Sequence, residues 1–147
     1  RGGGMCYAEK LLISRQDQLS PMHTHVIKAE DIINRGGATM VVELFGSDDD
    51  GNFAEDRGGM VMCDGLARSF EPGEKIKFAP GESLTLMPGD WHAFWGEGGD
   101  VLIGEVSTVN DDETDNIFRE PIGRFSTIEE DTDPKHLLVS DYKTWFG

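Results

Sequence analysis

The stretch PGESLTLMPGDWHAFWGE, residues 80–97, places a Pro-Gly pair on each side of the run SLTLMP (83–88). Proline fixes φ and glycine accepts a positive φ, so each pair is a turn signal. The run between the turns alternates as a half-buried strand does, and HAFWGE (92–97) begins directly after the second turn. The stretch therefore predicts two short strands joined by a tight turn.

Six further runs of this kind occur before residue 110, with glycine, proline, asparagine and aspartate clustered in the breaks. They are KLLISR (10–15), MHTHVI (22–27), TMVVELF (39–45), GMVMC (59–63), EKIKF (74–78) and VLIGEVSTV (101–109). No sustained helical period precedes residue 110, so a helical bundle is not expected. Many short, closely spaced strands predict an all-β fold, a small antiparallel barrel or jelly roll whose interior can hold a ligand.

The 147 residues are enough for one domain with a sizeable core, which we expect to span residues 1–147. The net charge of −15, from 13 basic and 28 acidic residues, argues against nucleic acid and anionic membranes as partners. We find no membrane-spanning run, no signal-peptide pattern and no cysteine motif. We therefore expect a cytoplasmic protein, with residues 1–6 flexible or engineered in origin.

Residues 110–134 differ from the rest, because they are dense in acids and show little strand alternation. We interpret them as a long ordered loop that packs back on the barrel. A last strand or short helix is expected in HLLVSDYKTWF (136–146).

Two histidines and a glutamate lie close together in MHTHVIKAE (22–30). His23 and His25 project from the same face of a strand, whereas Glu30 has the opposite parity and needs a bulge or turn to redirect it. The second Pro-Gly turn aims His92 inward. These side chains would offer three imidazole nitrogens and one carboxylate to Mn, Fe, Co, Ni or Zn, with positions left for water or substrate.

The alternative for a His-x-His pair alone is an exposed or hydrogen-bonded strand pair. The longer spacing argues against this alternative. H-x-H-x-x-x-x-E followed by Gly37, and then Gly81 followed by Pro-Gly-x-x-His, resembles the two-motif signature of the cupin superfamily. Cupins are small β-barrels, and the resemblance implies that His23, His25, Glu30 and His92 bind one metal ion in the barrel interior.

Four segments between Tyr7 and about Tyr142 indicate which family within the cupin superfamily the chain resembles. They are YAEKLLI (7–13), PMHTHVIKAEDIINRGG (21–37), PGESLTLMPGDWHAFWGE (80–97) and, most distinctively, GEVSTVNDDETDNIFREPIGRFSTIEED (104–131). On these segments the chain resembles the D-lyxose isomerase family of sugar-isomerising cupins. The resemblance implies a homodimeric aldose–ketose isomerase that interconverts D-lyxose and D-xylulose, with D-mannose and D-fructose as a further pair, usually with manganese.

One departure is that longer family members have a segment before the equivalent of YAEK. These 147 residues include no counterpart of it, so a lid, a dimer contact or a pocket wall is the expected loss.

Isomerisation through an enediol needs an electrophile and a base, and a divalent ion is the expected electrophile. Lys28 is a candidate acid or base, because burial and a nearby divalent charge would lower its pKa; a solvent-facing lysine is the alternative. For the carbon base we favour Glu120 in FREPIGRF. Glu105 in GEVS is the alternative base. It lies in a predicted strand, and the sequence does not show whether its side chain points into the barrel, near the metal, or out to solvent.

Sugar contacts are expected from several other side chains. Arg124 could orient hydroxyl groups or clamp a carboxylate, with a structural Glu120–Arg124 salt bridge as the alternative. Asp115 could bind sugar hydroxyls. Trp91, Phe94, Trp95 and Phe118 could offer apolar faces to the C–H side of a sugar, and of these Trp95 and Phe118 are the preferred candidates. The alternative is that they belong to the core, as barrel aromatics more often do.

Two other functions stay open. One is a cupin oxygenase with Fe(II) at the same four ligands, and the other is a non-catalytic sugar-binding module. The segment VNDDETDNIFREPIGRF (109–125) favours the isomerase, because it carries the most specific part of the resemblance.

Overall fold

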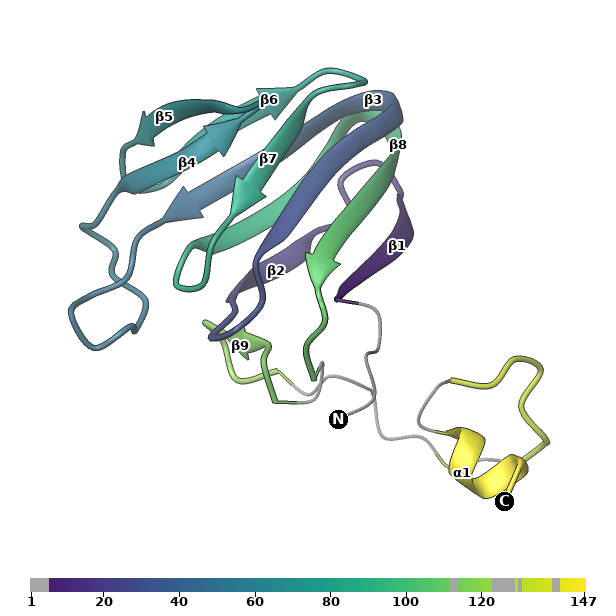
Figure 1. Ribbon diagram of the computed structural model, residues 1–147. Coiled ribbons are helices and arrows are strands. Elements are labelled where there is room, and N and C mark those ends of the chain that lie inside the picture. Colours follow the sequence, from purple (N-terminus) through teal and green to yellow (C-terminus); the bar gives the residue numbers. More distant parts are fainter. Residues whose placement is uncertain (1–5, 112–113, 123–128, 130, 139–140) are drawn as a thin grey trace.

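The computed structural model describes residues 6–111, 114–122, 129, 131–138 and 141–147. Over these residues the chain forms nine strands and one short helix (Figure 1). They are β1 (Tyr7–Ser14), β2 (Ser20–Thr24), β3 (Glu30–Phe45), β4 (Gly59–Cys63), β5 (Leu66–Phe70), β6 (Glu74–Phe78), β7 (Ser83–Leu86), β8 (Trp91–Thr108), β9 (Ile117–Phe118) and α1 (Tyr142–Trp145). The pairs that these strands form are antiparallel, which confirms the predicted all-β class.

The two long strands β3 and β8 form the spine of the sheet and pair from Glu30↔Ser107 to Phe45↔Trp91. Their register shifts on both sides of Gly37, and Gly98 and Gly99 in β8 have positive φ. Bulges and glycines of this kind bend a strand pair. Each half of the spine therefore meets different neighbours, β7 and β1 at one end and β6 and β2 at the other, and the sheet curls round on itself (Figure 1).

Several sequence-based predictions differ from the structure. β1 and β2 begin two to three residues earlier than predicted, and β2 ends at Thr24, before His25. The glycines of EGGD (97–100) do not separate two strands, because the ladder with β3 continues across them and 91–108 is one bent strand. β3 begins at Glu30 rather than residue 39. β5 was not predicted, since four of its five residues are exposed and give no apolar alternation.

The hydrophobic core lies along one face of the bent sheet. Its members are buried side chains of β3 to β8, with Met40, Val42 and Leu44 at alternate positions of β3. The same alternation continues into polar residues, from Ile32 to Glu30 in β3 and from Phe94 to His92 in β8. The buried face of the sheet thus ends in a cluster of ionisable groups.

The C-terminal third is only partly covered by the described residues. Ile117 and Phe118 pair with β2, so this part of the predicted loop 110–134 packs on the sheet. α1 corresponds to the predicted short helix and buries none of its residues. A single domain over residues 1–147 stays a prediction. Among the described residues, no helix is long and apolar enough to cross a membrane.

Gly37 is expected to be essential to the bend. A Cβ there would lie 2.3 Å from the carbonyl oxygen of Asp100, and φ is +98°. We expect Gly37→Ala to lower the free energy of unfolding by at least about 2 kcal/mol, measured by chemical denaturation. Gly65→Ala is the control, because its φ is +80° with nothing within 4 Å of the new Cβ, and it should cost only about 1 kcal/mol. Equal losses would contradict the role of the close approach.

Candidate metal centre and active site

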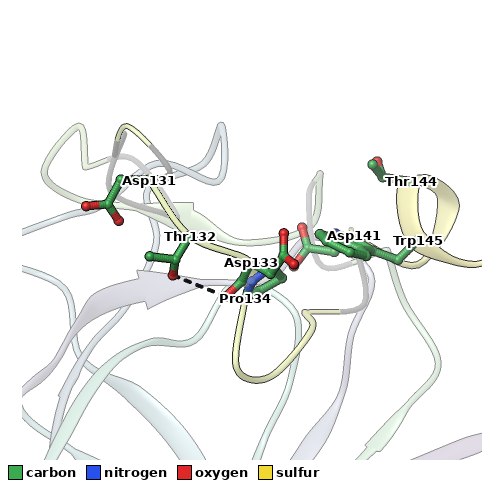
Figure 2. A pocket seen from close by; sticks show the side chains of 7 residues that line it. All are labelled: Asp131, Thr132, Asp133, Pro134, Asp141, Thr144 and Trp145. Atoms are coloured by element: carbon green, nitrogen blue, oxygen red, sulfur yellow. Dashed lines mark hydrogen bonds between the residues drawn. The ribbon is translucent and has the colours of Figure 1, made fainter.

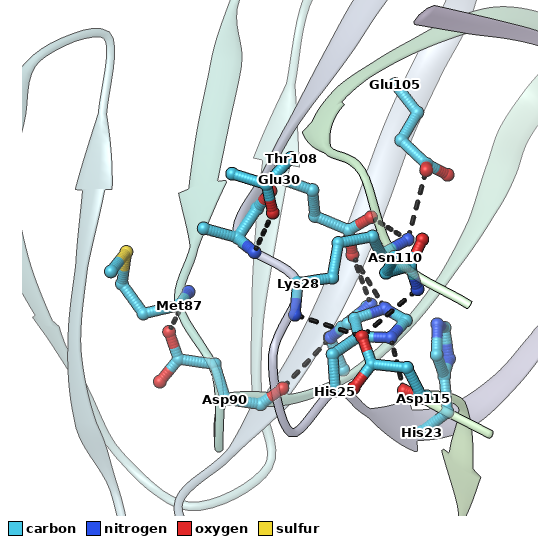
Figure 3. Close-up of polar contacts among 12 residues, drawn as sticks. His23, His25, Lys28, Glu30, Met87, Asp90, Glu105, Thr108, Asn110 and Asp115 are labelled. Atoms are coloured by element: carbon cyan, nitrogen blue, oxygen red, sulfur yellow. Dashed lines mark hydrogen bonds and ion pairs between the residues drawn. The ribbon is translucent and has the colours of Figure 1, made fainter. Parts of the chain in front are cut away.

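Four side chains meet at the polar end of the buried face. The ligand atoms of His23, His25, Glu30 and His92 all lie within 4.8 Å of one another, and Figure 3 shows three of these residues with their neighbours. The Nε2 atoms of His25 and His92 are each 3.2 Å from Glu30 Oε1. The structure therefore brings together all four residues that the sequence nominated as metal ligands.

Strand pairing and one bend create this cluster. His23 of β2 stands opposite His92 of β8 in the ladder. The chain bends at residues 26–27 before β3 begins, which gives Glu30 the redirection that its parity required. The second Pro-Gly turn also contributes, because the Gly89 N–H donates to the His25 carbonyl at 3.0 Å.

Each of the three imidazoles has its Nδ1 against a backbone carbonyl. A carbonyl oxygen can only accept, so Nδ1 carries the hydrogen and Nε2 of the neutral ring is a bare acceptor. The Nε2 atoms of His25 and His92 are buried and have no hydrogen-bond partner among the described residues. The pairs are His23 with Pro21 (2.7 Å), His25 with Asp115 (2.9 Å) and His92 with Asp90 (3.0 Å).

These acceptors converge on a carboxylate. Burial, reinforced by His92, lowers the pKa of His23 to about 3, so its ring is neutral at neutral pH. Burial opposes ionisation of Glu30, but the charge of Lys28, whose Nζ lies 2.6 Å from Oε2, favours the carboxylate, and the pKa of Glu30 is lowered. Lone pairs facing one another in a buried space need a cation between them. The donor set of three imidazoles and one carboxylate fits one divalent ion.

Lys28 lies inside the same cluster and is 3% exposed. Its Nζ is 2.6 Å from Glu30 Oε2 and 3.0 Å from Glu105 Oε1. Burial favours the neutral amine, but the charges of Glu30 and Glu105 outweigh it and raise the pKa of Lys28. Burial lowers this pKa as expected, but the two carboxylates beside the amine, which the sequence did not show, have the larger combined effect. The further lowering expected from a divalent ion stays a prediction. The solvent-facing alternative is excluded.

Glu105 points inward and is 7% exposed. It stands opposite Ile32 in the β3–β8 ladder and opposite Lys10 in the β1–β8 ladder. Its Oε1 accepts hydrogen bonds from Lys10 at 3.1 Å and from Lys28 at 3.0 Å. A carboxyl group with a buried lysine partner is thus present beside the four-ligand cluster.

Glu120 is not brought to this cluster. Its side chain is 76% exposed, and its carboxylate lies 3.8 Å from Nε of Arg119. The structure therefore places Glu105, and not the preferred Glu120, beside the cluster, while the identity of the carbon base stays a prediction. The sequence alone could not predict that Glu105 points inward, because the direction of its side chain depends on the register of β8 against β3.

A cavity of about 320 Å³ opens beside the cluster. His23 and Glu30 of the four-ligand cluster, together with Lys28 and Glu105, line this space, which has the size used for small molecules. Sequence reasoning missed Lys10 and Asn116, although both lie in segments that carry the family resemblance, because neither residue belongs to the metal-ligand motifs. The lining residues are Lys10, Leu12, Ser20, Pro21, His23, Lys28, Glu30, Phe94, Glu105, Asn116 and Phe118.

The expected sugar-binding residues are placed unevenly. Phe118 lines the cavity, with its ring centroid 5.6 Å from that of His23. Trp95 does not, because it lies on the other face of β8 with Lys75 Nζ 5.5 Å from its ring centroid. Phe94, one residue earlier, takes its place in the cavity wall.

Asp115 and Arg124 do not add to the cavity wall that the structure describes. Asp115 is 2% exposed, and its carboxylate accepts backbone N–H groups of residues 26–28. In the structure these contacts, and not the cavity, occupy the carboxylate of Asp115, so its expected contact with sugar hydroxyls stays a prediction that the structure does not support. Arg124 lies outside the described residues.

A larger hollow, of about 390 Å³, lies in the C-terminal segment (Figure 2). The described residues of its wall have carboxylates and hydroxyls but no imidazole or amine, so they do not pair an acid with a base. They are Asp131, Thr132, Asp133, Pro134, Asp141, Thr144 and Trp145.

Solved structures similar to this chain define its class. An L-ribose isomerase from Acinetobacter sp. DL28 matches with a TM-score of 0.58 and 19% identity, over 78% of this chain and 59% of the other. A dTDP sugar isomerase from Desulfovibrio desulfuricans G20 matches with a TM-score of 0.57 and 9% identity, over 81% of this chain and 68% of the other. Together with the curled antiparallel sheet, they show a cupin fold.

Sequence comparison narrows the class to a family. The family model for D-lyxose isomerase matches residues 1–142, and the chain belongs to this family. D-Lyxose/D-mannose isomerases from Serratia proteamaculans and Escherichia coli O157:H7 are 50% and 45% identical, over 92% and 94% of this chain. The chain spans 60% and 61% of the length of these two relatives.

Removing one ligand is expected to abolish tight metal binding. His92→Ala and Glu30→Gln should each weaken Co²⁺ binding by at least about a hundredfold, because each removes one of the four donors from a first coordination shell. Isothermal titration calorimetry measures the dissociation constants. His136→Ala is the control, since His136 is an exposed histidine of the C-terminal segment. Parent-like Co²⁺ affinity in His92→Ala would contradict the four-ligand centre.

Proposed function

We propose that this chain is a metal-dependent aldose–ketose isomerase that interconverts D-lyxose and D-xylulose through a cis-enediol, with D-mannose and D-fructose as a second pair and manganese as the metal. One observation supports this function most: the acid–base pair Lys28 and Glu105 lines the same cavity as two residues of the four-ligand cluster, His23 and Glu30. The family and the names of the two relatives support the choice of sugar.

His23, His25, Glu30 and His92 would hold one divalent ion, which when bound supplies Lewis-acid polarisation of the sugar oxygens. The residues of the chain carry the proton transfers. Glu105 takes the proton from C2 of the aldose, leaving the enediol, and returns it to C1 to form the ketose.

Lys28 is assigned the proton transfers to and from the sugar oxygen atoms at C1 and C2. Its ammonium donates a proton to the carbonyl oxygen at C1 as the C2 proton leaves, and the amine then accepts the proton of the C2 hydroxyl as the new carbonyl forms. The raised pKa of Lys28 keeps it protonated at the start of this cycle. The hydrogen bond to Glu105 holds the acid and the base side by side.

The cavity walls suit a sugar. Phe94 and Phe118 offer apolar faces to C–H groups, while Lys10 and Asn116 offer polar hydrogens to hydroxyl groups at the same cavity. Discrimination among sugars would then depend on the polar groups, since an unmatched buried donor is costly. The homodimer expected from the resemblance stays a prediction, which light scattering would test.

The first assay is D-xylulose formation from D-lyxose by metal-stripped protein with and without Mn²⁺. We expect turnover that requires Mn²⁺ and a kcat at least about a hundredfold lower in Glu105→Gln, about 2.7 kcal/mol of transition-state stabilisation. The amide keeps the shape of the side chain but cannot take a proton. Glu120→Gln is the matched control, and its kcat should stay within about threefold of the parent.

The two variants and the parent separate the possible failures. Loss of activity in Glu120→Gln with normal activity in Glu105→Gln would return the base to Glu120. No turnover of any pentose or hexose with Mn²⁺ would overturn the isomerase. Oxygen uptake with Fe²⁺ would then indicate the oxygenase, and sugar binding without turnover would indicate the non-catalytic module.

A further inference from the structure

Asp115 binds the chain between two functional residues, His25 and Lys28 (Figure 3). Its carboxylate accepts hydrogen bonds from three successive backbone N–H groups. Oδ1 accepts from residues 26 and 27, and Oδ2 accepts from residue 28. The donors are Val26 (2.9 Å), Ile27 (2.8 Å) and Lys28 (3.0 Å).

The main chain of Asp115 makes a second kind of contact. Its carbonyl oxygen lies 2.9 Å from Nδ1 of His25 and accepts the hydrogen of that nitrogen. The bond leaves Nε2 of His25 as a bare acceptor, 3.2 Å from Glu30 Oε1. One residue thus orients the ring of His25 through its main chain and the following three residues through its side chain.

The bend itself has little apolar support. The side chains of Val26 and Ile27 are 66% and 70% exposed, so they do not pack in the core and cannot fix the path of the chain by burial. The hydrogen bonds of Asp115 are therefore the main constraint on this bend that the described contacts show. Without them, the stretch would keep the Gly89 bond to the His25 carbonyl and the ion pairs of Lys28, but no described contact to the backbone N–H groups of residues 26–28.

The carboxylate of Asp115 is fully used by these contacts. Asn110 donates a fourth hydrogen bond, from Nδ2 to Oδ2 at 3.0 Å. Burial opposes ionisation, but the N–H groups of Ile27, Lys28 and Val26 and the Asn110 amide outweigh it and lower the pKa of Asp115. It remains a carboxylate at neutral pH, with no oxygen left over for a sugar.

We infer that Asp115 is a positioning residue for both halves of the site, aiming Nε2 of His25 into the four-ligand cluster and Nζ of Lys28 at Glu105. The inference rests on the proposed function. It also connects the site to the cavity wall, because Asn116 and Phe118 follow Asp115 directly and line the cavity. The ligand cluster, the acid and the wall then depend on one anchor.

The test is Co²⁺ binding to the metal-stripped full chain, followed by titration calorimetry and by the visible absorption of the bound ion. Asp115→Asn keeps the shape but puts an amide hydrogen against backbone N–H donors. We expect its Co²⁺ affinity to fall at least about tenfold, as for losses of groups that orient metal ligands, with an altered Co²⁺ spectrum. With saturating Mn²⁺, kcat on D-lyxose should fall more than KM rises, because Lys28 is displaced.

The matched control is Asp48→Asn. Asp48 also binds backbone N–H groups with its carboxylate, those of Asp50 (2.9 Å) and Asn52 (2.8 Å), but it is not among the described residues that line the cavity. Its Co²⁺ affinity and spectrum should equal those of the parent. Asn110→Ala is a milder variant that removes one of the four side-chain bonds, and we expect about a threefold loss of Co²⁺ affinity.

The outcomes distinguish this inference from the proposed function. Parent-like Co²⁺ affinity and spectrum in Asp115→Asn and Asn110→Ala, with only thermal stability reduced, would reduce Asp115 to a structural residue and overturn the inference. A second outcome is that both variants bind Co²⁺ more weakly than the parent while the parent turns over no sugar. This outcome would support the inference and overturn the isomerase. No Co²⁺ binding by the parent would overturn both.

Discussion

The structure depends on an electrostatic constraint, namely that buried acceptors face one another around Glu30. The imidazoles of His25 and His92 each direct a lone pair at the same carboxylate oxygen, at 3.2 Å. A buried polar atom without a partner costs about 1–3 kcal/mol. Such a cluster weakens the fold unless a cation joins it. The rest of the chain has to hold these groups in place against their own repulsion, and this requirement explains the arrangement of strands and hydrogen bonds around them.

The β3–β8 spine does most of this holding. Glu30 and His92 come from its two strands, and His23 is set by the pairing of β2 with β8. A slip of one residue would turn every side chain of a strand to the other face. The bulges beside Gly37 fix the register, so the glycine that bends the sheet also decides which residues reach the cluster. The bend and the site are therefore one structural feature.

Local rules predicted the parts of the site that depend on neighbouring residues. Strand parity placed His23 and His25 on one face, and the Pro-Gly turn placed His92 at the start of β8. The same parity puts Phe94, and not Trp95, on the face of β8 that carries His92. The sequence alone could therefore have predicted which aromatic residue lines the cavity. The choice of Glu105 needed the register of distant strands. The contacts of Asp115 span 87 to 90 residues, and no local pattern indicates them.

The charges of the cavity explain why a neutral sugar could be activated there. Two amines, those of Lys10 and Lys28, lie against two carboxyl groups, those of Glu30 and Glu105, at this cavity. A divalent ion in the four-ligand cluster would leave the cavity with an excess of positive charge. An enediolate develops negative charge on oxygen, whereas the bound sugar has none. Under the proposed function, a positive cavity stabilises the transition state more than the substrate, and such a difference is what accelerates a reaction.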